Sequence, residues 1–477
     1  MVRHFGTISL AQTKAPDYTF FNPLGSWLVY YPATWNLPLT ILAILLLISL
    51  LAVACHRRQL SWPSLLGGAL AWVSGLALLL GLGWEMLLAI KTLYPQYTAF
   101  YDAAFYNVRA YQVALLALGG ALFTAYYGWL SRWVRPEALV GGALVVVAVL
   151  LGLLQWQAAS SAFLLAWPLL FATLAWARCL RKSFSTNSLQ AADIVDVLLL
   201  LPTVALLGQV LYLLLPIFGL GPLVLLALPV LALLLGLALP LLLPVLAASG
   251  ARGSRALPLL GLAGAVGALA FGHATSQPTA SQPQQTHLYY TLDADHDSAY
   301  WLSAAPRPDG WTRHIFTAPQ YGPLPALFPK APYPLLHQAA PVLALSGPTL
   351  RVLSDSSGAG QRHLRLRILA GREGVTSLSL AIEAAAGLRI LRVAGHAVAA
   401  ANLVTSTAGI NITMQAPRAA GEILELEFAS GQPLRLAAIT RSLGLPALPM
   451  LPPLPANFVA MPGYNSFTTQ VRQESRL

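Results

Sequence analysis

The segment LDADHDSAYW contains ionisable residues at a spacing that could bind a metal ion. Asp293, Asp295 and Asp297 alternate with other residues, and His296 lies between the last two. Alternating aspartates resemble the start of a calcium-binding loop, but the glycine and the terminal glutamate of an EF-hand are missing. A polar turn between two strands is therefore the favoured interpretation.

The sequence does not contain a recognisable catalytic set. The nine histidines are dispersed, and there is no HExxH or CxxC pair and no GxSxG segment. A two-metal hydrolytic site needs several convergent His and carboxylate ligands, and an activated serine needs a strained turn. We therefore assign no catalytic, cofactor-binding or metal-binding residue, and we predict no cofactor in this chain.

Four acidic residues near the ends of apolar runs are further candidates, because ionisable side chains inside a membrane are costly and often functional. Glu85 lies near the end of its run, and Glu137 opens another. Asp193 and Asp196 lie three residues apart at the start of a third run, so they share a helical face. Acids suit the positive end of a helix dipole, which favours end-capping over a proton or ion relay.

The elements that must position these residues are mostly membrane spans. Of the 477 residues, 57% are hydrophobic and 9% are charged, and the mean hydropathy is +0.65. A helix needs about 20 apolar residues to cross the hydrocarbon core. The sequence predicts an α-helical polytopic membrane domain over residues 37–273, with about eight spans. These are Leu37–Cys55, Leu65–Ile90, Ala110–Leu130, Glu137–Trp156, Ser161–Ala177, Asp193–Phe218, Gly221–Ala248 and Ala256–His273.

A linker and a strand-rich domain follow the spans. Residues 274–285 are rich in Ser, Pro, Gln and Thr, which is typical of a tether. Further on, HLRLRIL and EILELEF alternate apolar and polar residues, as half-buried strands do. We predict an all-β, sandwich-like domain over residues 286–477. Its expected strands are His287–Leu292, Thr349–Leu353, His363–Leu369, Thr376–Ile382, Leu388–Val393, Ile410–Met414, Glu422–Phe428 and Leu434–Ile439.

The basic residues of the short loops predict the orientation in the membrane. The loops after the odd-numbered spans carry nine Lys and Arg residues, against two in the loops after spans 2, 4 and 6. Cytoplasmic loops are the ones enriched in basic residues. Both termini are then extracytoplasmic, including an approach segment over residues 1–36 and the whole β-domain. The 28 basic residues comprise 24 arginines and four lysines, and with abundant Ala and Leu they indicate a GC-rich bacterial genome. We therefore expect the bacterial inner membrane.

The distribution of charge limits the expected partners, and the positions of the cysteines argue against disulfides. Much of the net charge of +11 comes from the cytoplasmic loops, and the region from Ala274 onward has 15 basic against 11 acidic residues without basic runs. We expect the lipid bilayer as a partner and no nucleic acid, which would need a clustered basic footprint. Cys55 and Cys179 fall at predicted cytoplasmic span ends, where disulfides are disfavoured.

Several segments together resemble a known family. They are DYTFFNPLGSWLVYYPATW before the first span, SSAFLLAWPLLFATLAWA in the fifth, and YYTLDADHDSAYWLS, DGWTRHIF and ITRSLGLP in the β-domain. The chain resembles the part after the catalytic domain in membrane-bound zinc exopeptidases of the vacuolar membrane protease and endoplasmic reticulum metallopeptidase type. The resemblance implies an aminopeptidase-like domain outside the cytoplasm, followed by several spans and a terminal β-domain.

The sequence departs from this family at its start. The peptidase domain with its zinc ligands would precede Tyr18, where this chain has seventeen residues, so zinc is implied only for that missing domain. Residues 1–32 also lack the basic start and apolar core of a signal peptide. Three arrangements fit: a carboxy-terminal piece of a longer peptidase, a separate subunit beside a peptidase, or a stand-alone relative without the enzyme.

The expected function is a non-catalytic membrane anchor and accessory β-domain of a zinc-dependent exopeptidase system. Its expected protein partner is a peptidase domain or subunit. One alternative is a transporter or channel that uses spans 6 and 7, because both contain prolines, which interrupt helices, and broken spans can form transport sites. Another alternative is a stand-alone, membrane-tethered binding module. The prolines of spans 6 and 7 are Pro202, Pro216, Pro222, Pro229, Pro240 and Pro244.

Overall fold

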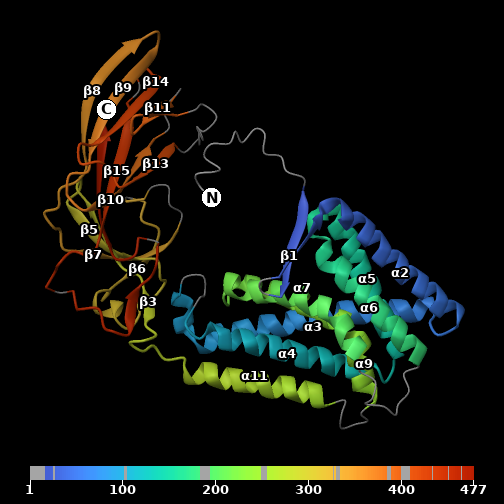
Figure 1. Cartoon of the computed structure of the whole chain (residues 1–477). Helices are drawn as coiled ribbons and strands as arrows, with labels where there is room; N and C mark the ends of the chain where they lie inside the picture. The colour runs from blue at the N-terminus through green and yellow to red at the C-terminus, as the bar shows by residue number, and fades with distance from the viewer. Residues whose placement is uncertain are drawn as a thin grey trace. The chain divides into compact units, whose positions relative to one another are not determined.

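The chain folds into a helical unit and a β-rich unit (Figure 1). The computed structural model describes residues 17–24, 27–100, 105–182, 194–248, 255–325, 327–328, 333–383, 388–398, 409–431, 433–449, 451–463 and 465–477. The helical unit comprises Met1–Thr98 and Asp102–Gln277, and the β-rich unit comprises Ala99–Tyr101 and Pro278–Leu477. This order of a helical region and then a strand-rich region confirms the predicted fold class.

Helices of spanning length make up most of the helical unit. Within the described residues, seven helices are long and apolar enough to cross a membrane. Their composition therefore fits a multi-pass membrane protein. They are α2 (Asn36–His56), α3 (Trp62–Leu93), α4 (Val108–Leu130), α5 (Pro136–Gln157), α6 (Phe163–Lys182), α7 (Ile194–Phe218) and α11 (Ala256–Ala274).

The predicted seventh span, Gly221–Ala248, is not one continuous helix. It consists of η7 (Pro222–Leu226), α8 (Ala227–Leu237) and α9 (Leu239–Ala248). Pro240 has no backbone N–H to continue the helical hydrogen bonds, so a break close to this residue has a direct cause. The pieces are each shorter than a span, which explains why the described part of the chain has seven spanning helices where eight were predicted.

The helices expose apolar side chains as well as burying them. In α2, Ala43 and Leu47 are buried, whereas Leu42, Leu45 and Ile48 are exposed. A water-exposed helix would place polar residues on its outer face. An apolar outer face suits contact with lipid chains.

Two glycines bring α3 and α5 into backbone contact. A Cβ atom added to Gly68 would lie 2.0 Å from the carbonyl oxygen of Ala138. A Cβ atom added to Gly142 would lie 2.2 Å from the backbone nitrogen of Ala69. Small residues at such crossings allow membrane helices to approach closely.

The aromatic approach segment ends in a hairpin that the sequence did not predict. Strands β1 (Tyr18–Leu24) and β2 (Trp27–Pro32) pair antiparallel, and the short helix η2 (Ala33–Trp35) leads into α2. The Asn36 side chain is buried and donates hydrogen bonds to Thr19 Oγ1 (2.8 Å) and to the Ala159 carbonyl (3.0 Å). These bonds connect the hairpin to the segment before α6.

The described residues of the β-rich unit form two large sheets (Figure 1). One has eight strands in the order β13-β10-β15-β17-β4-β5-β7-β6, and the other has five in the order β12-β11-β14-β9-β8. Strands β3 (Gln284–Thr286) and β16 (Phe458–Ala460) form a small parallel pair. The remaining strands are β4 (Tyr289–Asp293), β5 (Ser298–Ser303), β6 (Gln320–Gly322), β7 (Leu335–Ala340), β8 (Thr349–Gly358), β9 (Gln361–Leu369), β10 (Val375–Ile382), β11 (Arg389–Val393), β12 (His396–Ala397), β13 (Ile410–Gln415), β14 (Glu422–Ala429), β15 (Arg435–Leu443) and β17 (Thr468–Arg476).

One apolar core joins the two sheets. Leu366 and Leu426 come from the five-stranded sheet and pack in the same cluster as Leu380 and Leu436 of the eight-stranded sheet. Side chains alternate between the two faces of a strand. In the eight-stranded sheet, the residues that alternate with the core positions therefore form the outer face, where the candidate site lies.

Candidate ligand-binding site

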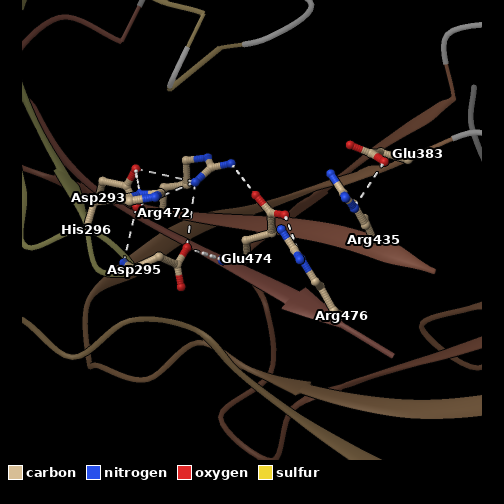
Figure 2. A network of polar contacts seen from close by, with 8 residues as sticks. All are labelled: Asp293, Asp295, His296, Glu383, Arg435, Arg472, Glu474 and Arg476. Atoms are coloured by element: carbon tan, nitrogen blue, oxygen red, sulfur yellow. Dashed lines mark hydrogen bonds and ion pairs between the residues drawn. The ribbon is translucent and has the colours of Figure 1, made fainter. Parts of the chain in front are cut away.

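A buried ion pair at the centre of the eight-stranded sheet organises the site (Figure 2). Strand β17 runs parallel to β4, and their register places Arg472 opposite Asp293. Arg472 Nη1 lies 3.5 Å from Asp293 Oδ2, and the two side chains are only 5% and 2% exposed. A buried charge is costly without a partner, so each of these groups requires the other.

Three further groups extend this pair into a network (Figure 2). Arg472 Nη2 lies 2.9 Å from Glu474 Oε2, and its Nη1 lies 3.6 Å from Asp295 Oδ2. His296 Nδ1 lies 3.0 Å from Asp293 Oδ2. The backbone N–H of Glu474 donates to Asp295 Oδ2 at 2.6 Å. The arginine is thus surrounded by three carboxylates from two strands and one turn.

The segment LDADHDSAYW forms the polar turn that was predicted. Asp293 ends β4, residues 294–297 turn, and β5 begins at Ser298. Asp297 adopts a φ of 44°, the left-handed conformation that tight turns use. Arg472 lies among the acidic side chains of this turn. Over the described parts of the chain, no group of three or more His, Cys, Asp or Glu side chains is placed to hold a metal ion.

A pocket of about 420 Å³ lies beside this network on the outer face of the sheet, a size typical of small-molecule sites. Arg472 and Glu474 border it, as do Arg435 and Glu383, whose side chains approach to 3.9 Å. The rest of the floor comes from β10, β13 and β15, and one wall comes from the segment before β7. These residues include Ser379, Ala381, Asn411, Thr413, Ala437 and Ile439 on the floor and Leu327, Phe328 and Tyr333 on the wall.

The pocket combines three kinds of surface. Two arginines and two glutamates balance in charge, Asn411 and Thr413 offer hydrogen-bonding groups, and Phe328 and Ile439 are apolar. Ligand sites commonly combine apolar walls with a few fixed polar groups that orient the ligand. This arrangement can therefore bind a small polar molecule without covalent chemistry.

The sequence did not identify Arg472 and Glu474 as site residues. Their strand contains polar residues at every second position, namely Gln470, Arg472, Glu474 and Arg476. That alternation was a strand signal, but the apolar positions between them are few. The charged residues Glu383 and Arg435 were also missed because each lies at the end of an otherwise ordinary strand.

The described acidic candidates of the helical unit lie in the first turn of a helix or on an exposed helix surface. Asp196 lies in the first turn of α7, as predicted for a helix-start acid, and its carboxylate accepts a 2.7 Å hydrogen bond from Arg178 Nε. Asp193 lies outside the described residues. Glu137 is in the first turn of α5, and Glu85 is exposed on α3. Pro202 and Pro216 lie inside α7, so the prolines of the sixth predicted span leave this helix continuous.

Comparisons with known proteins found no matching family model, no matching curated protein and no matching solved structure. The resemblance to membrane-bound zinc exopeptidases therefore stays a prediction from the sequence.

Proposed function

We propose that this chain is a membrane anchor whose accessory β-rich domain binds a small polar ligand beside a zinc-dependent exopeptidase. The pocket next to the Arg472 network is the observation that carries the binding role. The resemblance of the sequence carries the link to an exopeptidase. In this proposal, zinc and the catalytic residues belong to the peptidase domain or subunit.

The helical unit holds the β-rich unit at the membrane in this proposal. The seven apolar helices found among the described residues supply the anchor. The excess of basic residues in the odd-numbered loops supports an extracytoplasmic β-rich unit and extracytoplasmic termini. The excess of Arg over Lys and the abundance of Ala and Leu support a bacterial inner membrane. The physical role is to keep a recognition surface close to the peptidase, which raises its effective concentration there.

Purification from source membranes tests the proposal. An antibody against the β-rich unit is used to isolate the protein, and aminopeptidase activity is assayed with and without a zinc chelator. We expect chelator-sensitive activity to co-purify, together with either a larger band or a second subunit on an immunoblot. The recombinant chain of 477 residues serves as the control and is expected to be inactive. Zinc-dependent activity from that chain alone, or an isolate without peptidase activity, contradicts the proposal.

The same pocket also favours a second candidate, a stand-alone membrane-tethered binding module. The two candidates share the ligand site and differ only in the partner. An isolate that binds small ligands but contains no peptidase selects the second.

A further inference from the structure

Four neighbouring strands of the eight-stranded sheet present a row of buried polar side chains. Ser377 of β10 lies opposite Arg441 of β15, Arg441 opposite Gln470 of β17, and Gln470 opposite Thr291 of β4. The alternate residues Leu378, Val471 and Leu292 belong to the apolar cores. All four polar side chains therefore lie on the outer face of the sheet.

Each side chain of this row has a buried atom without a hydrogen-bond partner among the described residues. These atoms are Ser377 Oγ, Arg441 Nε, Gln470 Nε2 and Thr291 Oγ1. Ser377, Gln470 and Thr291 are at most 2% exposed. Buried polar atoms are rarely left unpaired, so several in a single row indicate a binding partner that the protein chain does not supply.

The charge of the row specifies the kind of partner. Arg441 is half-buried, and burial lowers the pKa of its guanidinium, with a smaller opposing effect from Tyr289. No carboxylate within the described ranges pairs with Arg441 as Asp293 pairs with Arg472. All four side chains can donate hydrogen bonds. A cation with a buried amide donor on the adjacent strand suits an anionic oxygen group.

The row borders the pocket described above. Ser379, Ile439 and Arg472 line the pocket, and each is two residues along its strand from a member of the row. Two residues span about 7 Å along a strand. A molecule that fills the pocket can therefore place a terminal group at the row.

We propose that Arg441 and Gln470, the two central side chains of the row, bind the carboxylate or phosphate group of a small ligand whose body occupies the adjacent pocket. This inference deepens the ligand-binding role proposed for the β-rich unit, and it rests on that role. It does not depend on the peptidase partner, because the binding is measured on the purified chain alone.

Matched pairs of anions test the proposal on the full chain in detergent. Phosphate is compared with phenylphosphate, and acetate with phenylacetate, at constant ionic strength, by following the midpoint of thermal unfolding. We expect a saturable rise with at least one pair, and tighter binding of its phenyl member because the ring enters the pocket. The pair that responds distinguishes a phosphate from a carboxylate ligand. Absence of a saturable rise with all four anions overturns the proposal.

Three variants assign the two parts of the site. Arg441→Gln should lower the affinity for the anion that gives a response by about tenfold or more, the usual cost of losing a charge-assisted hydrogen bond. Arg441→Lys keeps the charge and should retain part of the affinity. Ala437→Trp fills the pocket floor and should remove the advantage of the phenyl member while leaving the small anion bound. Arg389→Gln is the matched control, because Arg389 is exposed on the other sheet.

The stability of Arg441→Gln without added anion separates a ligand site from a structural role. An unpaired half-buried cation contributes no ion pair, so the variant should unfold at the same temperature as the wild type or higher. A lower midpoint without anion, or an equal anion response in the variant and the wild type, overturns the proposal. Equal binding of both members of a pair contradicts the assignment of the ligand body to the pocket.

Discussion

At the scale of single residues, Arg472 should be the most sensitive side chain of the β-rich unit. Arg472→Met leaves the carboxylate of Asp293 buried without its cation, a loss that typically costs about 3–5 kcal/mol. We expect the opening free energy of β4 and β17 to fall by about this amount, as measured by hydrogen exchange on the full chain. Arg476→Met on the same strand is the control.

The Arg476 side chain is 71% exposed and lies 4.0 Å from Glu474, so its loss should change the opening free energy by less than about 1 kcal/mol. Similar effects of the two variants would show that the buried pair has no special role. A double variant, Asp293→Asn with Arg472→Met, should recover part of the loss because the uncompensated charge is gone.

Glu422 should make the five-stranded sheet sensitive to acid. Burial acts to raise the pKa of Glu422, but the hydrogen bonds and charge of Arg418 outweigh it, so the pKa lies below its usual range. A lowered pKa in the folded state stabilises the fold above the unfolded value of about 4.3, and this contribution disappears as the pH falls through the folded pKa. Glu422→Gln should therefore destabilise β14 by about 1–3 kcal/mol at pH 7 and by less at pH 3.

Hydrogen exchange of β14 at both pH values, corrected for the intrinsic exchange rate, measures this difference. Glu373→Gln changes an exposed glutamate of a neighbouring loop and is the control. A deficit in Glu422→Gln that stays constant between pH 7 and pH 3 would rule out the ion pair as its cause.

At the scale of elements, the contact between α3 and α5 should be destabilised by the addition of a single methyl group. Gly142→Ala forces a Cβ atom against the backbone of Gly68 and Ala69, so the helices must separate. Overpacking of this kind costs about 1–3 kcal/mol. Resistance to unfolding by added SDS measures the loss in detergent. Gly152→Ala lies on the same helix with nothing within 4 Å of the added atom, and it should be neutral or slightly stabilising. Equal loss in both variants would contradict close packing at Gly142.

Sequence patterns were sufficient for the strands that bury one apolar face. The eight predicted strands overlap β4, β8, β9, β10, β11, β13, β14 and β15. In β9, Leu364, Leu366 and Ile368 alternate with exposed residues, which is the signal that the sequence carries. The central strand β17 was missed because its outer face carries Gln470 and Arg472, which are polar although they are buried. Such a strand resembles a loop in composition.

The candidate site could not be predicted for a different reason. Asp293 and Arg472 are separated by 179 positions in the sequence, and only the parallel register of β4 and β17 brings them together. Local patterns contain no information about such a register. The acidic turn was predicted correctly as a turn, but its arginine partner lay outside the reach of local spacing.

At the scale of the whole molecule, the orientation predicted from the basic loops can be tested with the two native cysteines. Cys55 and Cys179 are not joined in a disulfide, and both are expected near the cytoplasmic face. A membrane-impermeant maleimide added to intact cells should label a new cysteine at the exposed Ser356 of β8, and it should reach Cys55 and Cys179 only after permeabilisation. Single-cysteine variants and mass spectrometry separate the three sites. Labelling of Cys55 or Cys179 in intact cells would contradict the predicted orientation.

The position of β17 also determines the order in which the β-rich unit can assemble. Until residues 468–476 have been synthesised, β15 and β4 lack the strand that lies between them, and each presents an unpaired edge. Open edges of this kind invite pairing with other chains, and pairings between distant segments form slowly. A nascent β-rich unit is therefore vulnerable to aggregation until its last strand has formed, and chaperones that cover strand edges should raise its yield.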